Sequence, residues 1–362
     1  MEKLWSNTME KADVLVTGYG LVAPTVMDAR GLFALLGQHG SCLREHPDQP
    51  SGPAGFIDEQ QWQLIDEAIT DESANQSRHT LLSRYVAEQA LGQAALRAED
   101  FSAARSGLFL GCQPGQYRQT RCLAQWLGVH EYVSSHSDAC AAGTVAIGNA
   151  YRAVANGELE LALCGGIELL PEGSFASSAQ APSPFIPSEG AALIVLESAS
   201  HAQRRGARAL GRVLGYADRY QDTAEPGALY VQCMQAALHD AGLAPRQVQH
   251  VNVHSPSPLS MDNHEAQAVK QVFGTALPDT TFAANKFAVG HALAGSGAIE
   301  AVLSLMSLQL GVLLPTPDDG AARSPHTTMN FPDSLQQQTI DAVLSNSFSR
   351  NGTSSSLVLG RG

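Results

Sequence analysis

Short apolar segments alternate with helical stretches along most of this chain, and this alternation constrains the fold more than any other feature. The apolar segments are rich in Val, Leu and Ile and cover 14–20, 106–112, 159–166, 192–198, 248–255 and 355–361. Stretches typical of helices lie between them, including 83–96, 144–158, 230–243 and 296–311. Strands this apolar are buried on both faces, so the pattern predicts an α/β fold in which helices cover the sheets.

Two helical segments that begin in small residues suggest an internal duplication. One is CAAGTVAIG, in which a cysteine precedes the small residues. The other is GHALAGSGAIEAV, in which a histidine precedes them. We therefore predict an N-terminal half, 12–199, and a C-terminal half, 208–362, with a site at their junction. Segments rich in Ser, Pro or Gly are expected to be loops: 46–55, 173–190 and 318–333.

The composition excludes several classes of protein. The net charge is −13, which leaves no surplus of cations to neutralise phosphates and argues against a nucleic-acid partner. No apolar run approaches the ~20 residues that span a bilayer, and the start of the chain has no secretory signal, so we expect a cytoplasmic protein that binds no membrane. The six cysteines have no metal-ligand spacing and are expected to be thiols.

Cys140 has two interpretations. A free cysteine is most often a small buried apolar residue, and that is the simpler one. However, its neighbours Ala139, Ala141, Ala142 and Gly143 are small, so nothing bulky is expected to cover the sulfur. A helix from about 141 to 156 would place the thiol at a helix N-terminus, where N–H groups favour a thiolate and could hold the oxyanion of a thioester under attack.

Two histidines and an ion pair are the other candidates. His254 ends a strand and precedes proline-rich turn residues, and His291 follows Gly290 at a loop-to-helix junction. With 12 histidines in the chain, each alone is more often solvated or structural. Glu300 lies in an apolar helical run, where a carboxylate needs a partner, and we predict that Lys286 pairs with it. No His/Cys/Asp cluster in the sequence indicates a metal site.

Several separated blocks, taken in order, resemble the β-ketoacyl synthases of the thiolase fold, particularly the condensing enzymes of type II fatty-acid and polyketide synthesis. They are VLVTGYGLVAP, SDACAAGTVAIGNAYRAVANGELELALCGGIE, FIPSEGAALIVLE, VNVHSPSPLSMDNHEAQAVKQVFG, NKFAVGHALAGSGAIEAVLSLMSLQLGVLLPT and SNSFSRNGTSSSLVLG. The resemblance covers nearly the whole chain. It implies an α/β fold, a five-layer αβαβα sandwich made of two duplicated βα halves.

The resemblance also implies an acyltransferase activity. The reaction would be a decarboxylative Claisen condensation of an acyl thioester with malonyl-acyl carrier protein, in fatty acid or polyketide biosynthesis. Cys140 would hold the acyl chain as a thioester, and His254 and His291 would promote loss of CO2 and stabilise the enolate. Lys286 and Glu300 would orient the site.

Further expectations follow from the same resemblance. The backbone N–H of Cys140 and one from the loop 348–352 would form the oxyanion hole, and Phe348, Arg350 and Gly352 would belong to the pocket and this loop. No metal or organic cofactor is implied. The expected partners are an acyl carrier protein, malonyl and acyl thioesters, and a second ketosynthase chain, identical or different. Since the carrier is typically acidic, Arg204 and Arg205 are predicted to bind it.

The sequence also departs from the family. The pattern Asn-Ser-Phe-Gly-Phe-Gly-Gly-Thr-Asn reads Asn-Ser-Phe-Ser-Arg-Asn-Gly-Thr-Ser at 346–354, so Arg350 replaces a gating aromatic residue, and Ser349 and Asn351 replace glycines. A cation beside an acyl pocket would disfavour long aliphatic chains. The segment between Cys112 and Cys140 is also short for the family.

These departures leave two hypotheses and a weaker third. The first is an active, compact condensing enzyme with an unusual substrate, from a polyketide or aryl polyene-like pathway. The second is a chain-length-factor-like subunit that shapes the tunnel of an active partner. The weaker third hypothesis is a thiolase. A thiolase would need a second catalytic cysteine in the C-terminal block SNSFSRNG, which has none.

Overall fold

Two groups of five strands form the centre of the fold. The computed structural model describes residues 11–46, 49–69, 76–170, 185–223, 225–256, 259–316 and 329–362. One group runs in the order β5 (Tyr132–His136), β4 (Ser106–Gly111), β6 (Leu161–Glu168), β7 (Gly190–Ser198) and β1 (Val14–Val22). The other runs β10 (Thr281–Ala283), β9 (His250–Asn252), β13 (Ala342–Phe348), β14 (Thr353–Gly360) and β8 (Gly211–Tyr220).

The two groups share one topology. Numbered along the chain within its group, each reads third, second, fourth, fifth and first strand. Strands β1 and β8 join the groups through only three residue pairs, Val14↔Val213, Leu15↔Arg212 and Val16↔Gly211. Two small antiparallel pairs of strands lie outside this core: β2 (Arg44–His46) with β3 (Gln49–Ala54), and β11 (Val312–Leu313) with β12 (Gln336–Gln337).

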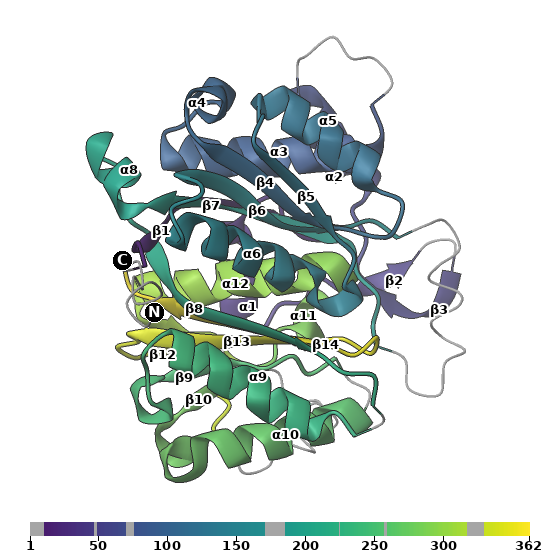
Figure 1. The fold of residues 1–362 in the computed structure, drawn as a ribbon. Helices are drawn as coiled ribbons and strands as arrows, with labels where there is room; N and C mark the ends of the chain where they lie inside the picture. Colours follow the sequence, from purple (N-terminus) through teal and green to yellow (C-terminus); the bar gives the residue numbers. More distant parts are fainter. Residues whose placement is uncertain are drawn as a thin grey trace, which may run out of the picture.

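Helices form three layers around these strands (Figure 1). The central layer holds α6 (Ala142–Ala155) and α12 (Leu293–Leu310), flanked by α1 (Ala29–Gly37) and α11 (Lys286–Val289). The first outer layer holds α2 (Glu59–Ala68), α3 (Arg78–Ala94), α4 (Ala98–Ala103) and α5 (Tyr117–Leu127). The second outer layer holds α9 (Gly227–Asp240) and α10 (Leu259–Phe273), while α8 (Ala199–Arg204) follows β7. Short 3₁₀ turns complete the chain: η1 (Ala139–Ala141), η2 (Pro245–Gln247) and η3 (Gly274–Asp279).

Small residues explain how the central helices pack so closely. A Cβ added at Gly143 of α6 would lie 2.7 Å from the carbonyl oxygen of Ala294, and one at Gly297 of α12 would lie 2.1 Å from Oγ1 of Thr144. Both helices are almost entirely buried. Their N-terminal ends can therefore meet at the junction of the two halves.

Helix α12 is long and strongly apolar. By length and hydropathy it could cross a membrane, yet 83% of it is buried inside the fold. A helix that is apolar all round belongs in a core of this kind, and its composition needs no membrane to explain it.

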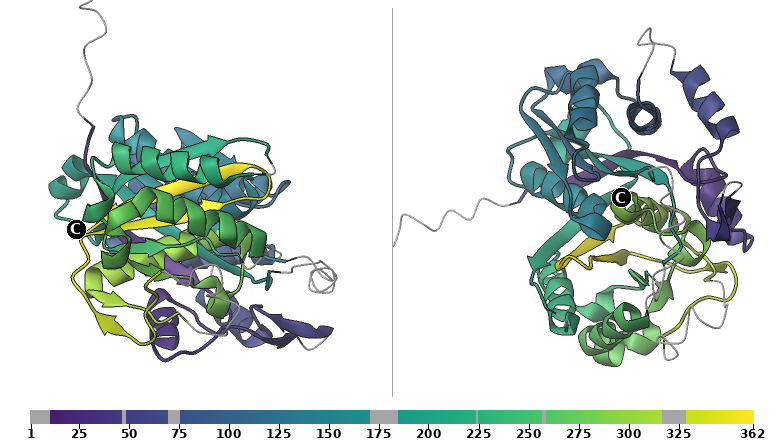
Figure 2. Two further views of the ribbon diagram at one scale, coloured as in Figure 1. Left: turned by 90° about the horizontal axis from the view of Figure 1, so that it is seen from below. Right: turned by 90° about the vertical axis from the view of Figure 1, so that its right-hand side faces the viewer.

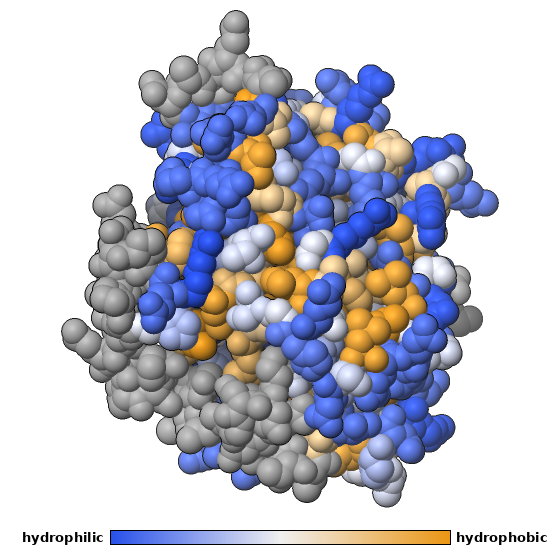
Figure 3. All heavy atoms as spheres, turned by 180° about the vertical axis from the view of Figure 1, so that it is seen from behind, coloured by the Kyte–Doolittle hydropathy of each residue, from blue (hydrophilic) through white to orange (hydrophobic). Residues whose placement is uncertain are grey.

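The rest of the molecule follows the same layered plan. The right-hand view of Figure 2 shows the outer helices of each half on opposite sides of the strands. On the face seen in Figure 3, hydrophobic residues gather across the middle, and hydrophilic residues lie above them and at the lower right.

The predicted strands are present, with ends that differ by a few residues. Among the ten central strands, β5, β8, β10 and β13 have no counterpart in the prediction, and neither have the four short strands outside them. The expected loop at 46–55 is wrong in part, because Gln49–Ala54 forms strand β3 against β2. Most of the other two expected loops, at 171–184 and 317–328, lies outside the described residues. The boundaries 12–199 and 208–362 stay a prediction.

Candidate active site

The nucleophile candidate lies in a turn directly before a central helix. Cys140 is the middle residue of η1, and α6 follows at Ala142. The residue before it, Ala139, has φ +47°, a left-handed conformation that costs energy for any residue except glycine. This strained turn places the thiol at the N-terminal end of α6, as the sequence predicts.

The expectation of an uncovered, easily ionised sulfur is wrong. Cys140 is only 7% exposed, and burial raises the pKa of its thiol to about 11. Four groups act in the opposite direction: the charge of Lys286, the backbone N–H of Cys140, the side chain of Ser349 and the backbone N–H of Arg350. At neutral pH the resting group is therefore a thiol, and nucleophilic attack requires a base that takes its proton.

Both predicted histidines lie beside this thiol. The sulfur and one nitrogen of each ring lie within 4.8 Å of one another, and the ring centroids of His254 and His291 are 5.6 Å apart. The pKa of each ring is held well below its ordinary value, mainly by burial and then by the charge of Lys286. Two neutral imidazoles therefore face the sulfur.

The hydrogen bonds of these rings leave nitrogens open towards a substrate. Nδ1 of His291 lies 2.9 Å from the hydroxyl of Ser296. Nε2 of His291 and both nitrogens of His254 have no hydrogen-bond partner among the described residues, although they are buried. Buried polar atoms without partners are costly, and an active site that receives a substrate oxygen is one explanation for them.

A buried ion pair supports His254 from one side. Nζ of Lys286 lies 2.5 Å from Oε1 of Glu300, the pairing predicted from the sequence, and also donates to the carbonyl oxygen of His254 at 2.8 Å. Because both side chains are buried, removal of either partner would leave an uncompensated charge. The pair fixes the backbone at His254.

Sequence reasoning missed the support on the other side. Glu265, on α10, accepts the backbone N–H groups of His254 and Ser255, both at 2.8 Å. Burial raises the pKa of this carboxyl to about 7, and the two N–H groups oppose the shift. The only available signal was an acidic residue on the helix that follows the strand of His254.

Each of the three reactive residues adjoins a left-handed residue. Ala139 precedes Cys140, Ser255 (φ +32°) follows His254, and Gly290 (φ +82°) precedes His291. A Cβ at Gly290 would also lie 2.6 Å from Cβ of Ser188, so glycine is required there. Strained backbone gathered around one cluster is typical of a functional site.

The loop after β13 contains the residues that are expected to supply a second oxyanion donor. Within it, N–H of Ser349 bonds to the carbonyl of Thr353, N–H of Gly352 to that of Ser349, and N–H of Asn351 to the hydroxyl of Ser349. The remaining N–H, of Arg350, reaches the sulfur of Cys140. This N–H and that of Cys140 itself are in the right place to hold an oxyanion at the thioester carbon.

The side chains expected at the pocket and in this loop have different surroundings. Phe348 is fully buried and stacks on Tyr230 with ring centroids 3.9 Å apart, next to His254. Gly352 takes the left-handed conformation that its turn requires, at φ +94°. Arg350 is exposed, and its place beside an acyl pocket stays a prediction.

The same three groups could bind a metal ion. One sulfur and two imidazoles match the ligand types of zinc. They also match the nucleophile and the two imidazoles of acyl transfer. The geometry alone allows both.

The predicted carrier-binding arginines lie far from this cluster. Arg204 pairs with Glu160 at 2.6 Å, and Arg205 pairs with the buried carboxylate of Glu197 at 2.5 Å. Both follow the end of β7, whose nine residues extend roughly 30 Å at ~3.3 Å per residue from the end near His291. Their role in carrier binding stays a prediction.

Comparison with known proteins resolves the family. The sequence matches the Beta-ketoacyl synthase, N-terminal domain, over residues 121–202 and the Beta-ketoacyl synthase, C-terminal domain, over 210–318, together more than half of the chain. The chain belongs to the β-ketoacyl synthase family. Within this family Cys140 occupies the N-terminal match, and His254, Lys286, His291 and Glu300 occupy the C-terminal one.

Individual relatives agree with this result. The chain is 32% identical to 3-oxoacyl-[acyl-carrier-protein] synthase 2 of Coxiella burnetii over 62% of this chain, and 33% identical to the protein of the same name from Synechocystis sp. over 59%. These matches span 60% and 58% of the two relatives.

Solved structures confirm the predicted fold. The ketosynthase complex titled "AntDE:AntF (apo): type II PKS acyl-carrier protein in complex with its ketosynthase bound to the hexaketide" is similar at a TM-score of 0.82 and 22% identity, over 97% of this chain and 100% of that one. "The ishigamide ketosynthase/chain length factor" gives 0.82 at 21% identity, over the same shares. The thiolase-like sandwich of two βα halves is therefore established.

Proposed function

We propose that this chain is an active β-ketoacyl synthase that condenses an acyl thioester with malonyl-acyl carrier protein. The observation that carries the proposal is the cluster of one thiol and two neutral imidazoles within 4.8 Å, with ring nitrogens that lack partners among the described residues. A subunit that only shapes a neighbouring tunnel has no physical need for this set. The names of the relatives, 3-oxoacyl-[acyl-carrier-protein] synthase 2, support the same reaction class.

The first half-reaction loads the acyl chain. The thiol of Cys140 loses its proton to a neighbouring imidazole and attacks the carbonyl carbon of the acyl-carrier thioester. The N–H groups of Cys140 and Arg350 hold the resulting oxyanion. The carrier thiolate then leaves and takes up the proton, so that the acyl group remains on Cys140.

The second half-reaction forms the carbon–carbon bond. The carbonyl oxygen of the malonyl thioester binds the open nitrogens of His254 and His291, CO2 leaves, and the electron pair passes into an enolate stabilised by these rings. The enolate carbon attacks the acyl carbonyl on Cys140. The cysteine leaves as a thiolate and takes up one proton, which comes from solvent by way of an imidazole, so that the ring ends neutral.

The chain-length-factor-like alternative rests on the altered loop. Ser349, Arg350 and Asn351 replace family residues beside the nucleophile, and the thiol is buried. The similarity to a ketosynthase/chain length factor structure is compatible with either role.

Direct acylation separates the two proposals. The protein is incubated with an octanoyl and with a short polyketide N-acetylcysteamine thioester, and Cys140 is examined by peptide mass spectrometry. We expect acylation of Cys140 in the wild type, none in Cys140→Ala, and malonyl-dependent release of a 3-oxo product that His254→Asn abolishes. If Cys140 stays unmodified with every thioester, also in the presence of a partner ketosynthase, the enzymatic proposal is wrong.

A further inference from the structure

The thiol and the two imidazoles of the active site form a set of metal ligands. Sγ of Cys140 and one ring nitrogen each of His254 and His291 lie within 4.8 Å of one another. Sulfur and imidazole nitrogen are ligands that zinc prefers, at about 2.3 and 2.0 Å from the ion. Two ligands of a tetrahedral zinc ion are then roughly 3.5 Å apart, so the three atoms need to approach one another by about 1 Å. Small side-chain rotations would therefore close the set around an ion.

The ring nitrogens of this set are available in the free protein. Nε2 of His291 and both nitrogens of His254 have no hydrogen-bond partner among the described residues, and each of the two residues is only 1% exposed. A substrate oxygen can satisfy these atoms only while a substrate is bound. Between turnovers the cost of the unpartnered nitrogens remains, and a metal ion that accepts a lone pair from each ring would reduce it.

Contacts around the set orient the two histidines. Nδ1 of His291 lies 2.9 Å from the hydroxyl of Ser296, which leaves Nε2 open to a metal ion. The backbone of His254 is held by Lys286 through its carbonyl oxygen and by Glu265 through its N–H group. Outer contacts of this kind fix the orientation of metal-binding histidines and strengthen binding.

The ligand types and the neighbouring charges decide which ion the set can take. The side chains of Cys140, His254 and His291 offer no oxygen ligand, so Mg²⁺ and Ca²⁺, which bind oxygen, are disfavoured. The charge of Lys286 acts on all three groups and opposes any cation. However, Lys286 is paired with Glu300 at 2.5 Å, and a thiolate ligand balances one of the two charges of Zn²⁺. The set therefore suits a borderline divalent ion such as Zn²⁺.

We propose that Cys140, His254 and His291 bind one Zn²⁺ ion and that this ion inhibits acyl transfer. The binding rests on these residues alone, and the inhibition rests on the proposed function. As the bond from sulfur to zinc forms, the thiol releases its proton to solvent, and a water molecule takes the fourth position on the ion. An acyl group on Cys140 occupies the sulfur, so the acylated protein should not bind zinc. The ion would therefore block loading of the acyl chain, and a loaded protein would escape it.

Cobalt gives a readout that does not depend on catalysis. The protein is freed of metal with EDTA, transferred to buffer without EDTA, and titrated with CoCl2, because cobalt replaces zinc in such sites and absorbs light when a thiolate is bound. We expect a thiolate-to-cobalt charge-transfer band that saturates at one equivalent and that ZnCl2 removes. An excess of MgCl2 should leave the band unchanged, since the set has no oxygen ligand.

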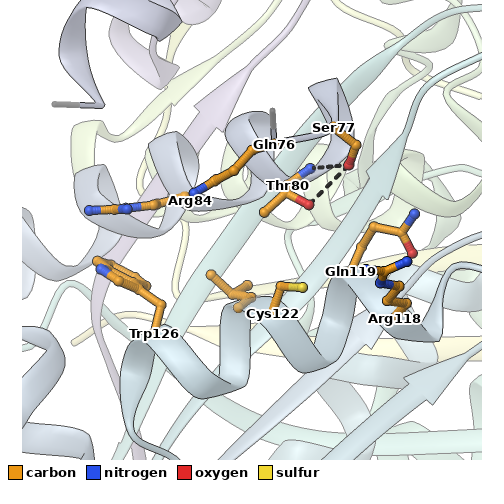
Figure 4. Close-up of a pocket in the computed structure, with 9 residues that line it drawn as sticks. Gln76, Ser77, Thr80, Arg84, Arg118, Gln119, Cys122 and Trp126 are labelled. Atoms are coloured by element: carbon orange, nitrogen blue, oxygen red, sulfur yellow. Dashed lines mark hydrogen bonds between the residues drawn. The ribbon is translucent and has the colours of Figure 1, made fainter. Parts of the chain in front are cut away.

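Cys122 provides the matched control. Its thiol is exposed and lies between Gln119 and Trp126 in a hollow between α3 and α5, outside the set (Figure 4). We expect Cys140→Ala to lose the charge-transfer band and Cys122→Ala to keep it. His291→Asn should weaken cobalt binding about 100-fold, because one of three ligands is lost. Cys122→Ala protein alkylated at Cys140 with iodoacetamide should also lose the band, which excludes misfolding of Cys140→Ala as the cause.

Inhibition is measured on the loading step. Acylation of Cys140 by an N-acetylcysteamine thioester is followed by mass spectrometry with and without ZnCl2. We expect ZnCl2 at about ten times its dissociation constant to slow loading about tenfold by mass action, and EDTA to restore the original rate. Protein acylated before the addition of CoCl2 should give no charge-transfer band.

The outcomes separate this inference from the proposed function. A charge-transfer band in a protein that no thioester acylates supports the metal site and contradicts the active enzyme. Acylation of a protein that gives no band, or a band that persists in Cys140→Ala, overturns the inference, whereas the activity stands. A band that disappears in Cys122→Ala would place the ion at the surface and would also overturn it.

Discussion

Ser349 contacts the nucleophile with a side-chain hydroxyl. The family pattern has glycine at this position, so the hydroxyl contact to Cys140 is a feature of this chain. The Ser349 oxygen accepts the backbone N–H of Asn351 and is 5% exposed. Its own proton is then available to the sulfur, where a hydrogen bond favours the charged form.

We expect Ser349→Gly and Ser349→Ala to raise the pKa of the Cys140 thiol. A thiol that loses a hydrogen-bond donor ionises at higher pH. The midpoint of the pH profile for alkylation of Cys140 by iodoacetamide should therefore move up by about one pH unit. Peptide mass spectrometry follows Cys140 separately from the other cysteines. Ser347→Ala is the control, because that hydroxyl bonds to Thr144 instead. An unchanged profile in both Ser349 variants would exclude the hydroxyl as a thiolate donor.

At the scale of elements, the central helices depend on residues that have no side chain. Gly143 of α6 faces the backbone of α12 at Ala294, so an added methyl group has no room and the backbone cannot yield easily. Gly92 of α3 is helical too, but nothing lies within 4 Å of its Cβ position. The same substitution should therefore have opposite effects in the two helices.

We predict that Gly143→Ala lowers the free energy of unfolding by about 2–3 kcal/mol, because overpacking forces the helices apart. Gly92→Ala should raise it by about 0.5–1 kcal/mol, since alanine is the better helix former. Urea denaturation followed by circular dichroism measures both. Destabilisation by Gly92→Ala, or no effect of Gly143→Ala, would contradict this account of the α6–α12 contact.

At the scale of the whole molecule, strand β5 ends the sheet of the N-terminal half. No described strand pairs with its outer edge, and Tyr132 and Val133 are 47% and 43% exposed. An open edge with apolar side chains is a template for another chain. We therefore expect the dimer to form through β5, with an identical chain or a related ketosynthase.

Sedimentation velocity tests this expectation. The wild type should be a dimer at micromolar concentration, and Val133→Lys should shift it to monomer, because a buried charge at the pairing edge is costly. Leu310→Lys, an equally apolar exposed position at the end of α12, is the control and should remain dimeric. A wild-type monomer would rule out the homodimer, and a dimeric Val133→Lys would place the interface elsewhere.

The sequence alone determined the layers and the chemical groups of this protein. Apolar strands and helices rich in small residues can be buried only in a layered α/β fold. The thiol, the two histidines and the Lys286–Glu300 pair can be recognised from local sequence patterns. The tertiary structure decided the burial and the contacts of those groups. Burial of the Cys140 thiol, its contacts with Ser349 and Arg350 and the approach of both histidines to its sulfur depend on segments distant in the chain. Local spacing carries no record of such contacts, because desolvation and charge act through space rather than along the sequence.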